Sequence, residues 1–333
     1  MAAYTTIDDP TIYMNPVLWT GNDTTATAIT GVGFQPDMTW IKERSQVRSH
    51  VLFDVVRGAT VQLNPNGNAL DATVAESLQS FDADGFTVGD ATSVNESGET
   101  YVGWNWKETA DAGFDIVTAT GTGSAKTINH SLSAVPDVIF SKEKTGSVND
   151  WAVYHHKNTS APETEMLILN ETNATSDQTC WNDTLPTSSV FSVGTTSVTN
   201  RSSSTYVYYL WAEKQGFSKF GSYEGNGADT PNGVFIYLGF SPAFILIKAT
   251  DINSWVMVNN KSPGYNPVDN SLSADSTAAE VTGDSNTTFD FLSNGFRTNG
   301  NSGNNNSSGQ KYIYMAFAEA PFVNSNGVPC NAK

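Results

Sequence analysis

Paired carboxylates are the first residues in this sequence that could do chemistry, because a glycosidase needs only two of them, about 5 to 10 Å apart. The candidates are Asp82 and Asp84, and the glutamates Glu108, Glu213 and Glu319. The three glutamates recur at intervals of 105 and 106 residues. A residue that recurs at nearly equal intervals along a chain typically occupies a structural position. We therefore expect these carboxylates to pair with a neighbouring lysine or to cap a turn, in a protein without enzymatic activity.

Histidines are the next candidates, as metal ligands: His50, His130, His155 and His156. Adjacent residues of a strand point to opposite faces, so His155 and His156 are not expected to share a metal. The sequence has no Cys and His cluster at zinc-ligand spacing and no P-loop, Gly-x-Ser-x-Gly or His-Glu-x-x-His motif. It therefore assigns no catalytic, cofactor-binding or metal-binding residue. The stretch 82–85 (DADG) resembles a calcium loop without its downstream glutamate, so a structural calcium ion is only a secondary expectation.

Aromatic residues offer a third kind of chemistry, the stacking of sugars on exposed rings. Trp104 and Trp106 alternate along one segment, and Tyr206 and Tyr208, with Trp211, lie along another. Alternate residues of a strand share a face, so the members of each alternating pair point together. We favour positions in the core for these rings and keep glycan stacking by exposed aromatics as the alternative.

These residues belong to motifs that occur three times. The first motif ends in glutamate: YVGWNWKE at 101–108, YVYYLWAE at 206–213 and YIYMAFAE at 312–319. The second begins with proline and ends with lysine: PDMTWIK at 36–42, PDVIFSK at 136–142 and PAFILIK at 242–248. The residue after the proline is aspartate in the first two copies and alanine in the last. Several motifs in the same order indicate three homologous units. The predicted division is an arm at 1–11, units at 12–110, 111–215 and 216–323, and an arm at 324–333.

Strands are predicted throughout the chain, because short β-branched and aromatic runs alternate with Gly, Asn, Ser and Pro. Units of about 100 residues with this pattern fit an all-β fold of antiparallel sandwiches or jelly-roll-like barrels. Only residues 71–80 read as a short helix. Short links between the units favour close packing, and the sequence leaves open whether the units form a string of beads or a closed pseudo-threefold disc.

Composition limits the partners of this 333-residue chain. Lys and Arg number 17 against 34 Asp and Glu, a formal net charge of -17, which argues against binding to nucleic acid. No run of about 18 apolar residues predicts membrane insertion, and the first residues lack the features of a signal peptide. Cys180 and Cys330 cannot form a disulfide framework and are equally compatible with free or paired thiols.

Several longer motifs carry a resemblance to a known family: TGVGFQPDMTWIKERS at 30–45, HVLFDVVRG at 50–58, SFDADGFTVG at 80–89, GFSKFGSYEGNG at 216–227 and FDFLSNGF at 289–296. They are similar to a domain of unknown function that is repeated in tail-fibre and virion structural proteins of marine bacteriophages, notably cyanophages and pelagiphages. The similarity covers about residues 12–323. It implies a phage structural protein and supplies no catalytic residues.

The expected function is therefore that of a virion protein, assembled in the host cytoplasm with other virion proteins. One reading is a tail or fibre-associated component for host-surface attachment, with a homotrimer favoured, a host glycan as a candidate partner and exposed aromatics in loops such as 299–309. The alternative is a capsid decoration or tail adaptor that buries apolar faces and terminal arms against other virion subunits. A glycan-depolymerising enzyme is the least favoured class.

Overall fold

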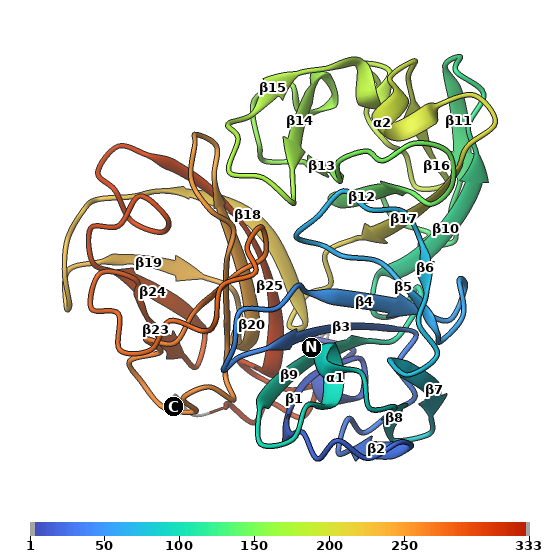
Figure 1. Cartoon of the computed structure of the whole chain (residues 1–333). Helices are drawn as coiled ribbons and strands as arrows, with labels where there is room; N and C mark the ends of the chain where they lie inside the picture. The colour runs from blue at the N-terminus through green and yellow to red at the C-terminus, as the bar shows by residue number, and fades with distance from the viewer. Residues whose placement is uncertain (1–3, 331–333) are drawn as a thin grey trace.

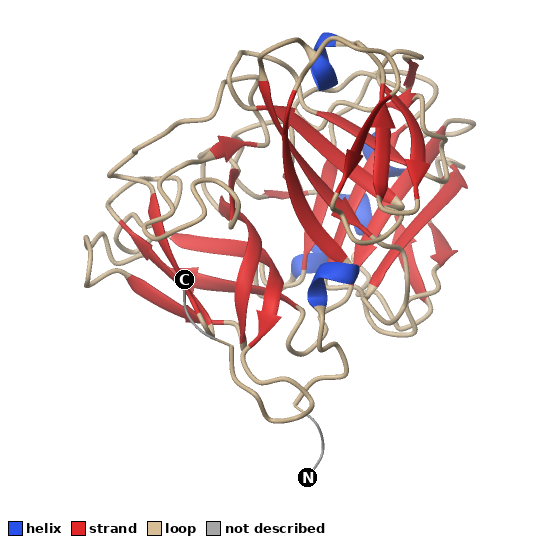
Figure 2. Cartoon of the chain, turned by 90° about the horizontal axis from the view of Figure 1, so that it is seen from below, coloured by secondary structure: helices blue, strands red, loops and turns tan. Residues whose placement is uncertain are grey.

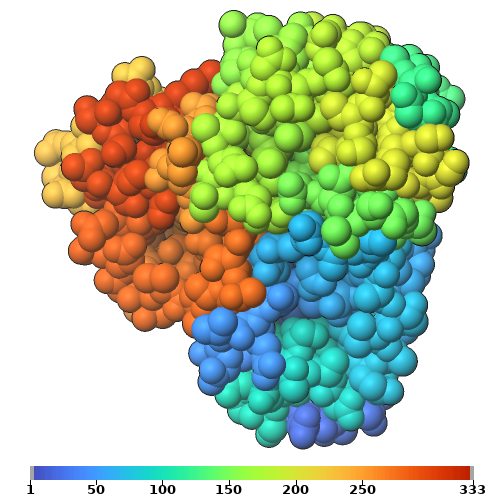
Figure 3. Space-filling model, turned by 45° about the horizontal axis from the view of Figure 1, so that its top comes forward, coloured from blue at the N-terminus to red at the C-terminus, as the bar shows by residue number. Residues whose placement is uncertain are grey.

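The computed structural model describes residues 4–330, and nearly all of its regular structure is β-strand. Three lobes surround a common centre, and each lobe is a consecutive stretch of sequence (Figures 1 and 3). Helices are short and lie between the strands (Figure 2). The all-β prediction is confirmed. Among the described residues, no helix is long and apolar enough to cross a membrane.

The bounds of the elements follow the chain. The first lobe consists of η1 (Pro10–Ile12), β1 (Met14–Thr20), β2 (Thr27–Thr30), β3 (Met38–Glu43), β4 (Val51–Asp54), β5 (Val61–Gln62), β6 (Ala72–Thr73), β7 (Leu78–Asp82), β8 (Gly85–Val88), α1 (Thr92–Asn95) and β9 (Thr100–Trp106). The second consists of β10 (Phe114–Thr120), β11 (Lys126–Asn129), β12 (Val138–Glu143), β13 (Ala152–His155), η2 (Pro162–Thr164), β14 (Glu165–Ile168), β15 (Ser176–Asp177), η3 (Thr179–Trp181), β16 (Val190–Val193), α2 (Ser197–Asn200) and β17 (Thr205–Trp211). The third consists of β18 (Ser218–Glu224), β19 (Val234–Tyr237), β20 (Phe240–Ala249), β21 (Val256–Asn259), β22 (Leu272–Ser273), β23 (Thr288–Leu292), β24 (Gly295–Asn299) and β25 (Lys311–Pro321).

Each lobe packs an inner sheet, which faces the centre, against an outer sheet. The inner sheets contain the strand orders β1-β9-β3-β4, β10-β17-β12-β13 and β18-β25-β20-β21, and the outer sheets are β2-β8-β7, β11-β16 and β19-β24-β23. Apolar side chains fill the space between the two sheets of each lobe, which makes each lobe a sandwich. The strand order therefore repeats from lobe to lobe, while the common origin of the three predicted units stays a prediction.

The helix predicted over residues 71–80 is wrong. β6 pairs with β5, and β7 pairs with β8, so this stretch satisfies its backbone groups through neighbouring segments. A helix of so few residues is marginal by itself, and strand pairing outweighs the local pattern.

The last strand of each lobe, β9, β17 or β25, is buried on both faces. In β17, Tyr206 and Tyr208 face the outer sheet of their own lobe, whereas Tyr209 and Trp211 face the common centre. Because adjacent residues of a strand point to opposite faces, apolar surroundings on both sides favour a continuous aromatic run. This explains why polar residues are so rare in the first repeated motif.

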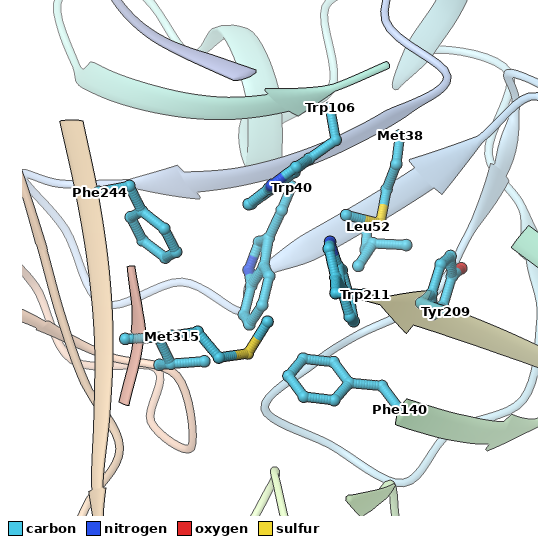
Figure 4. Close-up of a pocket in the computed structure, with 10 residues that line it drawn as sticks. Met38, Trp40, Leu52, Trp106, Phe140, Tyr209, Trp211, Phe244 and Met315 are labelled. Carbon is cyan, nitrogen blue, oxygen red and sulfur yellow. The ribbon is translucent and has the colours of Figure 1, made fainter. Parts of the chain in front are cut away.

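The three inner sheets share one apolar core at the centre of the molecule. Equivalent positions supply it, for example Trp106, Trp211 and Phe317 near the ends of the last strands. A cavity of only about 10 Å³ remains there, lined by residues of all three lobes (Figure 4). Such a volume holds at most about one water molecule. The lobes are thus closed around a packed core and do not form a string of beads.

Equivalent hydrogen bonds join the lobes in cyclic order. The residue just before β4, β13 or β21 has a ring N–H that donates to a backbone carbonyl of the neighbouring lobe. These bonds run from His50 Nε2 to Ser273 (3.1 Å), from Trp151 Nε1 to Asn64 (3.0 Å) and from Trp255 Nε1 to Ile168 (2.8 Å). A backbone carbonyl nearby accepts a peptide N–H from the same neighbour: Arg44 from Glu280, Lys144 from Asp71 and Thr250 from Thr175. The first lobe thereby contacts the third, the second contacts the first, and the third contacts the second, which closes the ring.

Each junction also contains a buried lysine, the last residue of the second repeated motif. The three ammonium groups donate to backbone carbonyls of nearby loops: Lys42 to Glu43, Lys142 to Asn68 and Asn149, and Lys248 to Ala249 and Asp251. Burial lowers the pKa of each lysine to about 8. These lysines therefore fix the loops at the junctions.

Much of the predicted N-terminal arm lies against the third lobe and the turn that leads to it. The Thr5 hydroxyl donates to the Gln215 carbonyl at 2.8 Å. The Ser325 peptide N–H donates to Asp8 Oδ1 at 2.7 Å, which joins the N-terminal segment to the segment after β25. Residues 1–3 and 331–333 of the predicted arms lie outside the described residues.

Candidate functional site

The recurring glutamates stand in three different lobes. Glu108 accepts the peptide N–H of Ile116 at 3.0 Å, and burial raises its pKa to about 7. The Glu213 carboxylate contacts the backbone of Phe220, and burial raises its pKa as well. Glu319 is half-buried within β25. The first two carboxylates thus hold the first strand of the next lobe, and the charge of Lys219 opposes the effect of burial on the pKa of Glu213.

The carboxylates of the DADG stretch are occupied by protein donors. Asp84 accepts the peptide N–H groups of Gly33 (2.6 Å) and Gly31 (3.2 Å), and these bonds lower its pKa. Asp82 accepts the hydroxyls of Ser80 and Thr87. Within residues 4–330 no group of three or more His, Cys, Asp and Glu side chains is placed to hold a metal ion. The calcium ion stays a prediction with no site assigned.

Histidines and cysteines take structural positions. The imidazoles contact backbone carbonyls: His50 with Ser273, His130 with Thr187, His155 with Tyr314 and His156 with Phe220. Burial lowers the pKa of His50 and of His155 to about 3, so both rings are neutral at pH 7. Cys180 and Cys330 are free thiols.

The aromatic residues singled out from the sequence are buried, so none of them can stack on a sugar. Trp104, Trp106 and Trp211 lie in the central core, and Tyr206 and Tyr208 lie inside the second lobe. The exposed aromatic side chains of the described residues are others, and all belong to the third lobe: Phe235 (47 % exposed), Tyr237 (48 %) and Tyr265 (67 %).

Two of these rings lie on the solvent face of the outer sheet β19-β24-β23. Phe235 stands opposite Arg297 of β24, which stands opposite Asp290 of β23, so the three form one row across the sheet. The guanidinium donates to Asp290 Oδ2 at 2.7 and 3.0 Å. The third ring, Tyr265, precedes Asn266, whose side chain pairs with the backbone of Phe291 on β23. Exposed aromatics therefore border this face at both sides.

The same face is polar and small in the other two lobes. β2, β11 and β19 have the same order of buried and exposed residues, with two exposed positions each. Those positions hold Ala28 and Thr30 in β2, Thr127 and Asn129 in β11, and Phe235 and Tyr237 in β19. The sequence contains this signal, because VFIY at 234–237 stands where the other units have TAIT and KTIN. The larger repeated motifs do not include this position.

A polar cleft of about 450 Å³ opens at one end of this outer sheet. Its lining includes two carboxylates, hydroxyls and amides: Asp229, Thr230, Asp269, Ser285, Asn286, Thr288 and Asn299, with Pro267 and two glycines. Thr288 and Asn299 face each other on β23 and β24, two residues along each strand from the Arg297–Asp290 pair. Aromatic rings and hydrogen-bonding groups thus share one surface, which we call the outer face of the third lobe.

The chain matches the model of a known protein family. The family model described as Domain of unknown function (DUF7483) matches residues 9–321, which span all three lobes. The chain belongs to this family. Searches of curated proteins and of solved structures found no match. The description of the DUF7483 family names neither an activity nor a source, so the phage association stays a prediction.

The asparagine-rich loop 299–309 of this DUF7483 chain is folded inward. Asn305 and Asn306 are buried, and the Asn306 amide donates to the carbonyls of Gly300 and Ala228. Asn95 and Asn200 occupy the equivalent positions of the other lobes, each six residues before the tyrosine that opens the first repeated motif. The loop thus supplies a structural amide and contains no aromatic residue.

Proposed function

We propose that this protein is a non-enzymatic structural component of a bacteriophage virion, associated with the tail or its fibres, that attaches the particle to the host surface. One observation carries the proposal: of three lobes with the same strand order, only the third exposes aromatic side chains among residues 4–330, at Phe235, Tyr237 and Tyr265. Aromatic rings among polar groups are typical of recognition surfaces. The resemblance of residues 30–45 and 50–58 to phage virion proteins supports the location in a particle.

In this proposal the closed centre is a scaffold and the outer face of the third lobe is the contact surface. The protein acts within the virion, next to other virion proteins, after assembly in the host cytoplasm. The homotrimer favoured from the sequence belongs to the proposal. A capsid decoration or tail adaptor is the alternative, and it requires the same aromatic face to be covered by another virion subunit.

The first test is the copy number of this protein in purified particles, measured by mass spectrometry against the major capsid protein. A small number of copies per particle is expected for a tail component. Copies in proportion to the capsid lattice would replace attachment by decoration, and absence from the particle would overturn both.

The second test is competition for adsorption by the purified protein. Wild-type protein is expected to block adsorption of the phage to its host, and the Phe235→Ala/Tyr265→Ser variant is expected to lose this effect. Thr127→Ala is the matched control, because Thr127 is the exposed residue of β11 that corresponds to Phe235. Equal competition by both variants would contradict the assignment of the contact surface.

A further inference from the structure

We propose that Asn232 is a site of spontaneous covalent modification, where the side chain cyclises onto the Gly233 peptide nitrogen and is converted to aspartate or isoaspartate. The reaction is independent of the proposed attachment function. Three features of the segment before β19 support it: an exposed amide side chain without hydrogen bonds, a glycine as the next residue, and a glycine N–H without an acceptor.

The reaction needs only the chain and water. The Gly233 nitrogen forms a bond to Cγ of Asn232, and the bond from Cγ to Nδ2 breaks. Nδ2 leaves as ammonia and takes the proton of the Gly233 N–H. Water then opens the cyclic imide: cleavage at Cγ gives aspartate, and cleavage at the main-chain carbonyl gives isoaspartate. Glycine favours the attack because it has no Cβ beside the nitrogen and permits most backbone angles.

Asn232 provides the free side chain. It is exposed, and its amide has no hydrogen-bond partner among residues 4–330. Its backbone is held in place, because the N–H donates to the Asp229 carbonyl at 2.7 Å and the carbonyl accepts from the Asn226 amide at 2.8 Å. The side chain can therefore rotate toward the next peptide group without competing contacts.

The pairing of β19 with β24 leaves the Gly233 N–H free. The Leu238 N–H donates to the Asn294 carbonyl at 2.9 Å, and hydrogen-bonded pairs alternate along an antiparallel ladder. Gly233 falls between the bonded positions of this alternation, so its N–H points to the open edge of the sheet, where β19 is the last strand. Within the described residues this N–H has no acceptor.

The sequence contains five other Asn-Gly pairs, which begin at Asn66, Asn226, Asn294, Asn299 and Asn326. Each of them is protected, either by a bonded or paired glycine or by burial of the asparagine. Gly67 donates to Asn64, Gly227 to Asn306 and Gly327 to Asn324, Gly295 pairs with Leu292 in the β23–β24 ladder, and Asn299 is 1 % exposed. Only the pair at Asn232 leaves both reacting groups free.

The conversion changes the outer face of the third lobe alone. The two residues before β2 and β11 are Thr25–Ala26 and Ser124–Ala125, so the other lobes lack the reactive pair. Isoaspartate lengthens the main chain just before β19, and both products add a negative charge next to Pro231, whose carbonyl accepts from Arg297 at 3.0 Å.

Incubation of the folded full chain in mildly alkaline buffer, followed by peptide mapping with mass spectrometry, tests the proposal. Position 232 is expected to convert about tenfold faster than any other Asn-Gly pair, because the protected pairs must first open locally. Electron-transfer fragmentation distinguishes isoaspartate from aspartate. Asn232→Gln should abolish the fast conversion, because glutamine must close a larger and slower-forming ring. Asn326→Gln, at an exposed pair whose glycine N–H is bonded, is the matched control and should leave the fast conversion unchanged.

The chain unfolded in guanidinium chloride gives the reference rates, and there the six pairs should convert within about threefold of one another. Two results would overturn the proposal. One is conversion of Asn326 in the folded chain as fast as that of Asn232. The other is an intact Asn232 in the folded chain after the time in which the unfolded chain converts it. Circular dichroism during the incubation verifies that the chain stays folded. Neither result bears on attachment, which copy number and adsorption test separately.

Discussion

The junctions between the lobes and the outer sheets of the lobes differ in how strictly they repeat. At the junctions, His50, Trp151 and Trp255 make the same ring N–H to carbonyl bond, one per lobe. On the outer sheets, the same backbone carries Ala28, Thr127 and Phe235. Closing a ring of three lobes demands the same geometry three times, whereas a solvent face makes no such demand. Recognition can therefore specialise in one lobe without disturbing the scaffold.

The first junction shows how far the repeated bond tolerates a change of residue. Trp40 Nε1 donates to His50 Nδ1 at 2.9 Å, which leaves the proton on Nε2 for the bond to Ser273. The second lobe has Phe140 and Trp151 at the same two positions. A large and a small ring are thus exchanged between the two positions, and the bond to the neighbouring lobe is kept.

Removing a junction ring should have the largest effect on stability. Trp255→Ala deletes a buried side chain of the central core together with its bond to Ile168, and we expect a loss of about 3–5 kcal/mol in the free energy of unfolding. Denaturant titration followed by tryptophan fluorescence and by circular dichroism measures it. Trp255→Phe, which keeps most of the volume, should cost less than half as much. A loss below about 1 kcal/mol for the alanine variant would show that the junctions do not hold the lobes.

Acid should weaken the junctions that use histidine. The pKa of His50 is about 3 in the folded protein, against an ordinary value near 6.5. Between these values the unfolded chain binds a proton that the folded chain does not, so the free energy of unfolding falls as the pH falls from about 6.5 toward 3. Trp40→Phe/His50→Trp should remove about 3 kcal/mol of this fall between pH 6.5 and 4. Denaturant titrations at pH 6.5 and pH 4 measure the fall in the free energy of unfolding. If the fall were the same in the variant and in the wild type, His50 would not be a buried neutral ring.

Alkali should stabilise the protein through the buried lysines, by less than acid destabilises it through His50. The pKa of Lys248 is about 8 in the folded protein and near 10.5 when exposed, so between these values the unfolded chain holds the extra proton. Stability should therefore rise as the pH increases from 8 to 10. Lys248→Met should reduce this rise by about 1–2 kcal/mol, as measured by denaturant titration at pH 8 and 10. A rise of the same size in the variant would exclude a contribution from Lys248.

Changes on the outer face should leave stability almost untouched. Phe235→Ala should alter the free energy of unfolding by less than about 0.5 kcal/mol, because the ring is half-exposed and outside the apolar cores. Its effect is expected on binding alone. If the thermal midpoint fell as much as for Trp255→Ala, Phe235 would be a scaffold residue and the contrast between junction and outer face would disappear.

Much of the fold follows from the sequence, because period-two patterns and recurring motifs depend on local residues. The strand that contains Lys42 and the aromatic strand that ends before Glu108 both occur where the motifs predict them. The closed arrangement of the lobes depends instead on contacts such as Trp151 with Asn64, which join distant segments. No spacing in one sequence encodes such a contact.

The candidate site was harder to predict for a related reason. An aromatic residue in a strand gives the same signal whether its face is buried or free, so Trp104 and Phe235 cannot be distinguished before the neighbours are known. Burial on both sides of β9 and a single solvent face on β19 decide the difference. The cleft adds loop segments around 229 and 269 whose approach only the folded chain defines.

The contact between Asp8 and Ser325 has a consequence for the order of the lobes along the chain. Segments near both ends lie side by side, and the three junctions are equivalent, so the ring does not depend on which lobe comes first. A circular permutant that opens the chain in the link between β9 and β10 and joins the present ends should build the same ring. The ring is thus expected to form whichever lobe comes first in the chain, so gene rearrangement could place any one of the lobes at either end.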